Sequence, residues 1–424
     1  MVPDTRPVRQ PAYRIGPKKT ELMRKEVDYL LQNNLAVPSC SPWASPSLLV
    51  PKEGGKVRFC TDYRRVNLCS VPDAYPLPRV DDLIDSVGQA QLVTKLDLLH
   101  GYHQIPLTPS AQKISAFITP FGLYEYCVMP FGLRNAGSTF QRMINGVIRG
   151  IPGVCAYLDD ILIVADDVEQ HRTRVEMVLK SLRDWNLTVN LSKSTFFSAT
   201  VTYLGHVVGN GIVRPKTANV EAILDFPVPT NKKKLQSFLG MAGFYRRFCP
   251  NFATIAYPLT QLTGSKIDFV WDDNCQKSFE SLKDFLTNEP ILKSPNFSLP
   301  FVLHTDACET GTGAVLLQQH DDGILHPICY YSCQLKKHQL AYSTIEKELL
   351  GIINALQKFD CYLYGVVPLV IYTDHNPLTF LQRAQHTNQR LLRWSLHLQQ
   401  YPLEIRHIKG VDNILADTLS RVSS

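Results

Sequence analysis

Two adjacent carboxylates stand between apolar, strand-forming runs near the middle of the chain. Residues 154–157 precede Asp159 and Asp160, and residues 161–165 follow them. This pattern predicts a strand, a tight turn and a second strand. Strands of this kind are normally buried, and burying two ionised carboxylates requires a compensating cation, for which a divalent metal is the obvious candidate. The alternative is an ordinary hairpin turn that places both acids in water.

The hydrophobic pattern of the first half of the chain indicates alternating strands and helices. It predicts, in order, an extended proline-rich arm over 1–17, a helix from Thr20 to Pro38, a hairpin of 47–50 with 57–60, a strand over 92–96 that runs into Asp97, and a helix after Asn135. A strand, a helix and then the acidic hairpin is the order of a split βαβ sheet.

The pattern changes in the second half of the chain. A basic run at 232–234 leads into apolar positions at helical spacing, with Arg246 and Arg247 behind them. This predicts a small basic helical unit, although such a charge run is more often a solvated face than a binding surface. A connecting region follows, and residues 301–306 begin a second α/β domain.

Composition places the chain among ordinary globular proteins. Its 424 residues are 45% hydrophobic, which is enough for two to four domains. The net charge of +6 permits nucleic acid as a partner without requiring it. The eleven cysteines are scattered and contain no Cys-x-x-Cys pair, which argues against a disulfide framework or structural zinc and favours an intracellular location. No signal peptide or membrane-spanning run is seen, so no membrane association is expected.

The acidic residues suit metal-dependent chemistry on nucleic acid. Polymerisation of nucleotides uses two Mg²⁺ ions about 3.5–4 Å apart, bridged by carboxylates from at least two strands. Asp97 at the end of one strand, together with Asp159 and Asp160 at the hairpin, provides such a set. The C-terminal domain has its own four candidates, which could hold two further Mg²⁺ ions for phosphodiester hydrolysis: Asp306, Glu348, Asp374 and Asp417.

With these motifs in order, the chain resembles the reverse transcriptase and ribonuclease H region of a gypsy-type long-terminal-repeat retrotransposon pol polyprotein. In the first part of the chain the resemblance is carried by residues 41–46, 57–64, 96–105, 129–141, 157–160, 190–193, 203–206 and 238–248. In the C-terminal domain it is carried by residues 305–307, 346–350, 372–376 and 413–421.

The resemblance implies an α+β and α/β multidomain fold, in which a right-hand polymerase is followed by a ribonuclease H-like domain. The implied parts are an N-terminal arm (1–17), fingers and palm (18–214), a thumb-like helical unit (215–265), a connecting region (266–299) and the ribonuclease H-like domain (300–424). The implied function is RNA- and DNA-directed DNA polymerisation by two-metal nucleotidyl transfer, coupled to hydrolysis of the RNA strand of RNA:DNA hybrids.

The resemblance also assigns roles to individual residues. All seven carboxylates above are expected to be catalytic metal ligands for Mg²⁺, two ions per site, with Mn²⁺ as a substitute. The expected nucleotide contacts are Lys52, Arg58, Tyr102, Phe131, Gly132 and Lys193, with the ring of Tyr102 excluding a 2′-hydroxyl. The expected primer and template contacts are Tyr157, Tyr203, Leu204, Gly205, Arg246 and Arg247.

The implied partners are an RNA template, a DNA primer, the RNA:DNA hybrid and dNTPs. The implied setting is a longer pol polyprotein, in a cytoplasmic retroelement particle or in the nucleus.

Some positions admit other interpretations. Tyr102 could be a core tyrosine, and His100 with His103 lacks the third ligand that a zinc site needs. Periodicity does not choose between Glu346 and Glu348, but Ser343-x-x-Glu346 fits a capping box, which gives Glu346 a structural role, and the family register favours Glu348.

The sequence also departs from the family pattern at a few positions. These are His100, Gly137, Ser138, Ser194, and His407, which stands one position further from the Lys-Gly loop than in related viral enzymes.

Two other functions remain open. The chain could be a nucleic-acid-binding remnant adopted by a host, although all seven carboxylates are in place. It could also be a nuclease with a silent polymerase half, which predicts loss of Asp97 or Asp159, and neither is lost.

Overall fold

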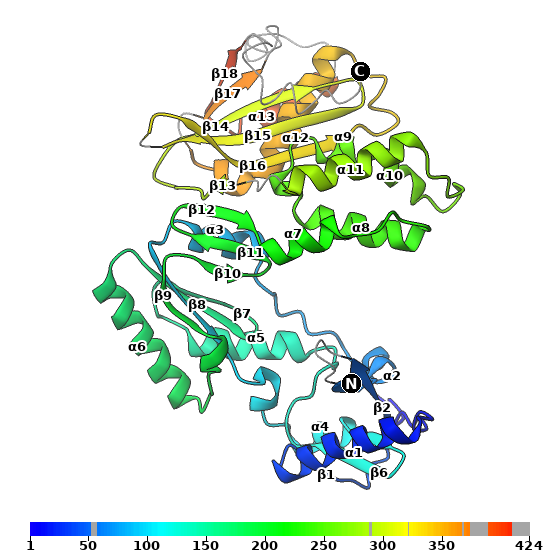
Figure 1. Cartoon of the computed structure of the whole chain (residues 1–424). Coiled ribbons are helices and arrows are strands. Elements are labelled where there is room, and N and C mark those ends of the chain that lie inside the picture. The colour runs from blue at the N-terminus through cyan, green and yellow to red at the C-terminus, as the bar shows by residue number, and fades with distance from the viewer. Residues whose placement is uncertain (52–56, 288–290, 321, 367–368, 374–388, 409–424) are drawn as a thin grey trace. The chain divides into compact units, whose positions relative to one another are not determined.

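The computed structural model of the chain describes residues 1–51, 57–287, 291–320, 322–366, 369–373 and 389–408 (Figure 1). It divides into two compact units, the first formed by residues 1–83 and 91–201 and the second by residues 84–90 and 202–424. Helix α3 (Val80–Gly88) begins in the first unit and ends in the second. The predicted site residues Lys52, Asp374 and Asp417 lie outside the described residues.

A four-stranded antiparallel sheet forms the centre of the first unit. Its order is β7 (Val154–Tyr157), β8 (Asp160–Ala165), β4 (Leu92–Asp97) and β9 (Thr195–Ser198). Helices α5 (Ala136–Val147) and α6 (Val168–Asp184) pack their apolar residues against this sheet (Figure 1). Buried residues of this core include Phe140, Ile144, Val178, Ile161 and Leu96. The predicted strand into Asp97, the acidic hairpin and the helix after Asn135 are all confirmed.

A five-stranded sheet forms the rest of the first unit. Its order is β1 (Ala36–Pro38), β6 (Gly122–Tyr126), β5 (Phe117–Thr119), β2 (Ser45–Pro51) and β3 (Val57–Thr61), with β2 and β5 parallel and the other pairs antiparallel. The predicted hairpin is confirmed as β2 and β3. Short elements complete the unit: α2 (Arg64–Leu68), α4 (Pro109–Ile114) and the 3₁₀ turns η2 (Gly101–Gln104) and η3 (Leu191–Lys193).

Helix α1 (Pro17–Gln32) packs Val27 and Leu30 on this sheet. It starts before Thr20 because proline is compatible with the first turn of a helix, and it ends before β1 instead of continuing to Pro38. Both predicted ends of this helix are therefore wrong.

The N-terminal arm contains no helix before Pro17, as predicted, but it packs against the unit through a β-bridge. The backbone N–H of Gln10 donates to the carbonyl of Ala44 over 2.9 Å, and the N–H of Ala44 donates to the carbonyl of Val8 over 2.9 Å. The prediction missed this pairing because no periodic pattern marks a single β-bridge.

The second unit begins with a small sheet and a group of helices. The sheet has the order β10 (Val201–Tyr203), β11 (His206–Gly209), β12 (Ile212–Pro215) and β13 (Leu292–Lys293). The helices are α7 (Thr217–Leu224), α8 (Lys232–Phe244), the 3₁₀ turn η4 (Arg246–Phe248), α9 (Phe252–Ile255), α10 (Tyr257–Leu262) and α11 (Asp273–Thr287). The helix predicted after the basic run at 232–234 is confirmed as α8.

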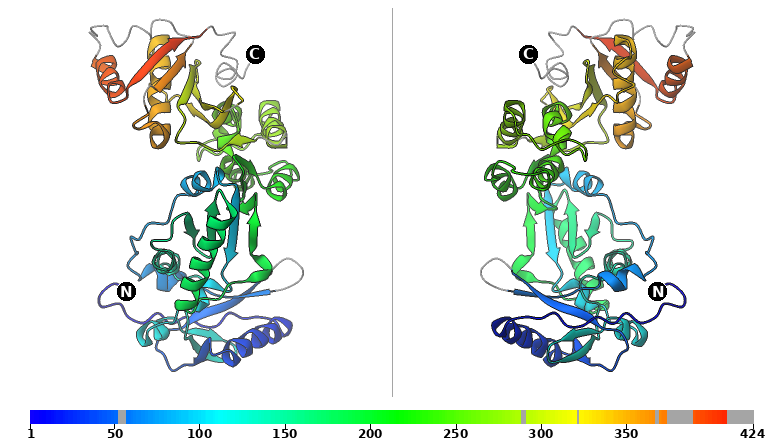
Figure 2. Two further views of the ribbon diagram at one scale, coloured as in Figure 1. Left: turned by 90° about the vertical axis from the view of Figure 1, so that its left-hand side faces the viewer. Right: turned by 90° about the vertical axis from the view of Figure 1, so that its right-hand side faces the viewer.

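The C-terminal part of the second unit is a mixed five-stranded sheet with helices. The strand order is β16 (Leu325–Gln334), β15 (Gly311–Gln319), β14 (Phe301–Ala307), β17 (Leu369–Thr373) and β18 (Leu403–His407). The pairs β14–β17 and β17–β18 are parallel, and the other two are antiparallel. Helix α12 (Thr344–Leu363) packs on this sheet together with α13 (Gln389–Leu398), as both views in Figure 2 show.

No helix within the described residues is both long enough and apolar enough to span a membrane.

Two candidate active sites

The first candidate site is the turn between β7 and β8. In the register of β4 with β8, Asp97 lies directly opposite Asp160. Asp159 occupies the turn, where its backbone carbonyl accepts a hydrogen bond of 3.0 Å from the N–H of Leu98. The preceding residue, Leu158, has a left-handed backbone (φ 52°), which is rare for a side chain of this kind. The structure therefore brings all three predicted carboxylates to one end of the sheet.

Two lysines lie beside these acids. The Nζ of Lys95 is 3.0 Å from an oxygen of Asp160, and the Nζ of Lys193 is 4.0 Å from an oxygen of Asp97. Burial raises the pKa of Asp160, the ammonium of Lys95 opposes the rise, and the carboxylates of Asp159 and Asp97 add to it. The repulsion among the three carboxylates is thus partly relieved by the ammonium of Lys95.

The donor set fits a divalent cation, because it offers only carboxylate oxygens, which magnesium prefers. Within the described ranges, however, no group of three or more His, Cys, Asp and Glu side chains is positioned to hold a metal ion as it stands. The first site consequently has the right ligands on adjacent strands, and these side chains would have to move closer together to coordinate one ion.

An aromatic cluster borders the acidic turn. The ring of Tyr102 lies 4.9 Å from that of Phe131 and 5.3 Å from that of Phe140, measured between centroids. Burial raises the pKa of Tyr102, and the negative charge of Asp159 raises it further. Tyr102 is thus partly buried beside the carboxylates, with Phe131 packed against it.

A cavity of about 200 Å³ borders this cluster at Phe131. Arg58, His100, His103 and Phe131 contribute to its lining. The rings of His100 and His103 are stacked with centroids 6.0 Å apart, and burial lowers the pKa of His103 to about 4, with His100 as a smaller cause. Gly132 and Arg58 are both exposed, so both predicted nucleotide contacts are accessible.

The second candidate site lies between β14 and α12. Asp306 on β14 and Glu348 on α12 are only 3% and 4% exposed. The backbone N–H of Ala307 donates to Oε1 of Glu348 over 3.2 Å, which fixes the helix beside the strand. Strand β17 ends at Thr373, directly before Asp374 in the sequence. His407 ends β18, which pairs in parallel with β17.

The structure gives Glu346 and Glu348 different surroundings. Ser343 and Glu346 form the predicted capping box, and Oε1 of Glu346 also accepts a hydrogen bond of 2.9 Å from Arg390. Glu346 therefore stabilises the helix start, while Glu348 faces the strand that carries Asp306.

The predicted primer contacts are divided between surface and interior. Tyr157, Leu204, Gly205 and Arg246 are at least partly exposed. The Nη2 of Arg246 also donates to the carbonyl of Ser332 over 2.9 Å.

Tyr203 and Arg247 do not fit the predicted role. Tyr203 is fully buried, because alternation along β10 turns its side chain into the core. Arg247 is 8% exposed and pairs with Asp85 of α3 over 3.1 Å, and Asp85 also accepts a hydrogen bond from Tyr362 of α12. The prediction of primer contact is therefore wrong for these two side chains.

Three residues near the first site were not predicted from the sequence. Gln141 accepts the N–H of Leu158, Lys95 pairs with Asp160, and the Oγ of Ser194 accepts the N–H of Asp97 over 3.1 Å. The sequence did mark Gln141 as unusual, because its polar side chain lies on the apolar side of α5. Ser194, where the sequence departs from the family pattern, is compatible with the site, because its hydroxyl accepts a hydrogen bond from the backbone of Asp97.

Comparisons with known proteins agree with this geometry. Residues 50–208 match the family described as reverse transcriptase (RNA-dependent DNA polymerase), and residues 296–401 match the RNase H-like domain found in reverse transcriptase. The chain is 40% identical over 418 residues to the retrovirus-related Pol polyprotein from transposon opus of Drosophila melanogaster, covering 94% of this chain and 42% of that protein.

Two further relatives support the same assignment. The Pol polyprotein from transposon gypsy of the same species is 37% identical over 438 residues, covering 99% of this chain and 42% of that protein. The solved foamy viral protease-reverse transcriptase in complex with dsDNA superposes with a TM-score of 0.85 at 25% identity, covering 96% of this chain and 86% of that one. The chain thus spans less than half the length of the opus and gypsy polyproteins.

Fold and family matches together define a reverse transcriptase domain followed by an RNase H-like domain. The chain belongs to the reverse transcriptase and RNase H region of gypsy-type retrotransposon Pol polyproteins. Enzymes of these families generally depend on divalent metal ions.

Proposed function

We propose that the chain is an RNA- and DNA-directed DNA polymerase coupled to a ribonuclease H that degrades the RNA strand of the hybrid it makes. The observation that carries this proposal is the placement of Asp97 opposite Asp160, with Asp159 in the intervening turn, inside the segment that matches the reverse transcriptase family. The RNase H-like match over 296–401, which includes Asp306, Glu348 and Asp374, supports the second activity.

In the polymerase, Asp97, Asp159 and Asp160 would hold Mg²⁺, or Mn²⁺ in its place. Ions held by these carboxylates would supply activation of the primer 3′-hydroxyl and neutralisation of the triphosphate charge. Asp97 and Asp160 come from paired strands, so the ladder fixes the spacing of their backbones, and only their side chains have to rearrange around an ion.

The neighbouring side chains would select and orient the nucleotide. Arg58, Lys52 and Lys193 are suited to triphosphate oxygens, because guanidinium and ammonium groups both pair with phosphate. The ring of Tyr102, packed against Phe131, would lie under the sugar and exclude a 2′-hydroxyl.

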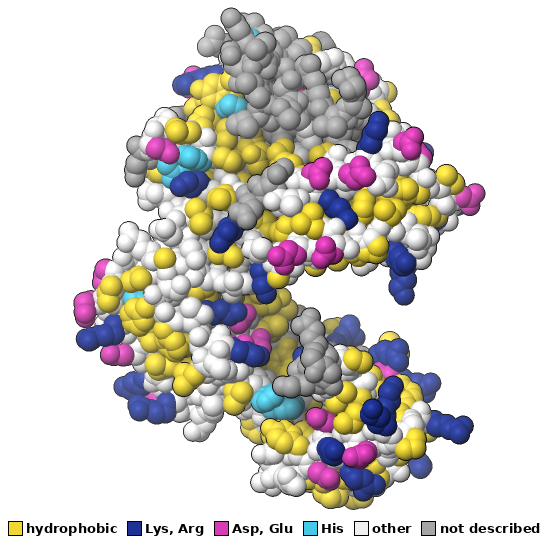
Figure 3. Space-filling model, viewed as in Figure 1, with side chains coloured by type: hydrophobic (Ala, Val, Ile, Leu, Met, Phe, Trp, Pro, Cys, Tyr) yellow, Lys and Arg dark blue, Asp and Glu magenta, His cyan; other side chains and the backbone are white. Residues whose placement is uncertain are grey.

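Template and primer would be held mainly through their phosphates. On the face shown in Figure 3, Lys and Arg side chains are interspersed among acidic and apolar ones over the first unit. Tyr157, Leu204, Gly205 and Arg246 remain the proposed primer and template contacts. Binding through phosphates should weaken steeply as salt rises, because it releases counterions.

In the nuclease, Asp306 and Glu348 would act with Asp374 and Asp417 as ligands for Mg²⁺. The bound ions would activate water against the phosphodiester and stabilise the departing 3′-oxygen. Burial of Asp306 and Glu348 supports this role, since their charges are costly in the interior unless a cation or donors accompany them.

The test is primer extension on an RNA template with Mg²⁺, run beside cleavage of a labelled RNA:DNA hybrid. Asp159→Asn should abolish extension and spare cleavage, whereas Asp374→Asn should do the reverse. The two variants are matched, because each replaces one carboxylate by an isosteric amide and serves as the folding control for the other.

If both variants retained both activities, the assignment of the two sites would be wrong. If the unmodified chain bound RNA:DNA hybrid but performed neither reaction, the nucleic-acid-binding remnant would be the better description.

A further inference from the structure

A buried amide bonds the turn that carries Asp159, in addition to the bond that Asp159 accepts from the N–H of Leu98. Gln141 of α5 is fully buried, and its Oε1 accepts the backbone N–H of Leu158 over 2.8 Å. Its Nε2 donates to the carbonyl of Ala156 over 2.9 Å. Gln141 therefore bonds on both sides of Tyr157, at the end of β7 and in the turn itself.

Leu158 needs this support because of its backbone conformation. A left-handed backbone is unfavourable for a residue with a branched side chain, and such strain persists only where surrounding bonds enforce it. Asp159 follows Leu158 directly. A relaxed Leu158 would therefore redirect Asp159 and shift it relative to Asp97.

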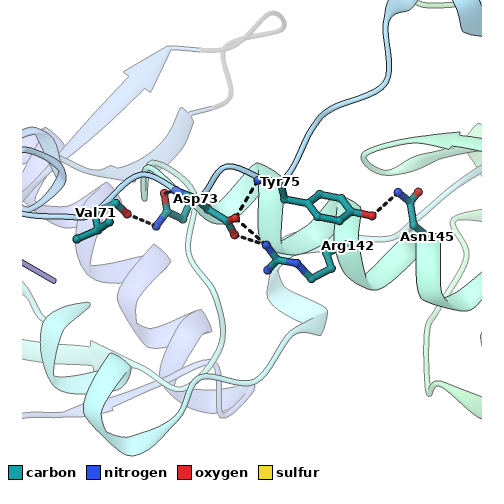
Figure 4. Close-up of polar contacts among 6 residues, drawn as sticks. Val71, Asp73, Tyr75, Arg142 and Asn145 are labelled. Atoms are coloured by element: carbon teal, nitrogen blue, oxygen red, sulfur yellow. Dashed lines mark hydrogen bonds and ion pairs between the residues drawn. The ribbon is translucent and has the colours of Figure 1, made fainter.

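The amide of Gln141 is itself fixed by a chain of polar contacts. Its Nε2 donates to Oδ1 of Asn145 over 2.9 Å, and Nδ2 of Asn145 donates to the hydroxyl of Tyr75 over 2.6 Å. Tyr75 lies in the segment between α2 and α3. Figure 4 shows this segment lying along α5, with the Tyr75 hydroxyl directed at Asn145.

The segment around Tyr75 is tied to the first turns of α5 and to its middle. Arg142 donates twice to the carboxylate of Asp73, over 2.7 and 2.6 Å, and its guanidinium lies 4.7 Å from the centre of the Tyr75 ring (Figure 4). Asn135 donates to the carbonyl of Val71 over 2.9 Å. Tyr75 is thereby placed independently of the bond it makes to Asn145.

We propose that Gln141 is a positioning residue of the polymerase, which holds the Leu158 turn so that Asp159 points toward Asp97. Asn145 and Tyr75 hold the amide of Gln141 in the orientation that this task requires. The inference rests on the proposed polymerase function and adds to it residues that touch neither metal nor substrate.

The main test is Gln141→Met, which keeps the length of the side chain and removes all three hydrogen bonds. The kcat of primer extension should fall about 10- to 100-fold, the cost expected when a reacting group is displaced by a fraction of an ångström to one ångström. The KM for dNTP should stay within about threefold, because Arg58 and Tyr102 are untouched.

A second readout distinguishes positioning from loss of folded protein. Binding of Mn²⁺ without substrate, followed by electron paramagnetic resonance in an Asp306→Asn background, should weaken about fivefold or more in Gln141→Met. Misfolding would lower the number of binding sites, whereas misplacement of Asp159 weakens each site.

The chain offers a matched control in Gln318 of β15. This glutamine is also fully buried and likewise makes three bonds: one accepted from the N–H of Asn296, and two donated to the carbonyls of Asn296 and Leu299. Gln318→Met should leave extension and first-site Mn²⁺ binding unchanged. Tyr75→Phe, which removes only the distant hydroxyl, should lower extension about two- to fivefold.

The outcomes separate the inference from the proposed function. If Asp159→Asn abolishes extension but Gln141→Met changes neither kcat nor Mn²⁺ affinity, the inference is overturned and the function stands. The inference is also overturned if Gln318→Met produces the same losses. If Asp159→Asn retained primer extension, both the proposed polymerase site and the inference about Gln141 would be wrong.

Discussion

The two candidate sites place their acids in opposite surroundings. At the first site Asp159 is exposed, and the side chains of Asp97 and Asp160 retain 19% and 20% of their accessible surface. At the second site Asp306 and Glu348 are almost completely buried. One set of carboxylates lies at strand ends and in a turn, while the other lies between a sheet and the helix that covers it.

This difference shows that the protein fixes the positions of its carboxylates in two ways. The first relies on local backbone geometry, namely the left-handed Leu158 and the buried amide that holds it. The second relies on packing, since β14 and α12 share one hydrophobic core and a backbone amide orients Glu348. Small backbone changes should therefore damage the first site, and only loss of a ligand should damage the second.

The largest expected effect tests the packed site with two neighbouring acids. Glu348→Gln should lower cleavage of a labelled RNA:DNA hybrid at least about 1,000-fold, because it removes a proposed metal ligand. Glu346→Gln should leave cleavage within about threefold and cost less than about 1 kcal/mol of stability, since glutamine can retain the capping box and only the charge of the pair with Arg390 is lost.

Cleavage rates and urea unfolding of the two variants check this prediction. A large loss of cleavage in Glu346→Gln, with Glu348→Gln active, would reverse the assignment of the two glutamates.

An intermediate effect is expected from a single methyl group at the first site. A Cβ at Gly101 would lie 2.9 Å from the ring of Phe140 and 3.3 Å from the Cβ of Asp159. Gly101→Ala should lower extension about 10- to 100-fold by displacing Asp159, and overpacking should cost about 1–3 kcal/mol of stability. Hybrid cleavage should not change.

The matched control for this substitution is Gly240→Ala. Gly240 lies in α8 with no atom near the added Cβ, so this change should be neutral or slightly stabilising. Equal loss of extension in both variants would refute a specific effect at Asp159.

The smallest expected effect is a dependence of stability on pH in the first unit. Burial lowers the pKa of His103 from 6.5 to about 4, so as the pH falls through this range the unfolded chain takes up a proton before the folded one does. Stability should therefore fall between pH 6.5 and 4.

Replacing His103 by Phe should reduce the stability lost between pH 7 and pH 5 by up to about 2 kcal/mol. Hydrogen exchange of residues 117–126 in urea at the two pH values measures this loss. An identical loss in the variant and the unmodified chain would mean that other groups cause the acid sensitivity.

Much of the first site could be predicted from sequence because its elements are strongly patterned. The apolar runs on both sides of Asp159 predicted the hairpin, and the strand before Asp97 was equally clear. The family resemblance, confirmed by the matches over 50–208 and 296–401, supplied the order of domains. Asp97 and Asp160 could thus be expected on paired strands before any register was known.

Contacts between distant segments could not be predicted in this way. The family resemblance implied a phosphate contact for Arg247, but its partner in the structure is Asp85, 162 residues away in the sequence. Tyr203 belongs to a strand of three residues, too short for its alternation to be read. The role of Gln141 depends on the carbonyl of Ala156 and the N–H of Leu158, and backbone groups leave no trace in a residue pattern.

The buried ion pair of Arg247 with Asp85, whose carboxylate also accepts a hydrogen bond from Tyr362, bears on how the protein can be divided. Together with the bond from Arg246 to Ser332, it joins the helices after residue 231 to both β16 and α12. A shortened polymerase that stops before residue 300 would leave the pair of Arg247 and Asp85 on newly exposed apolar surface, and Asp85 would lose its bond from Tyr362. Such a truncation should be prone to aggregate, so the two activities are better separated by point substitutions than by cutting the polypeptide.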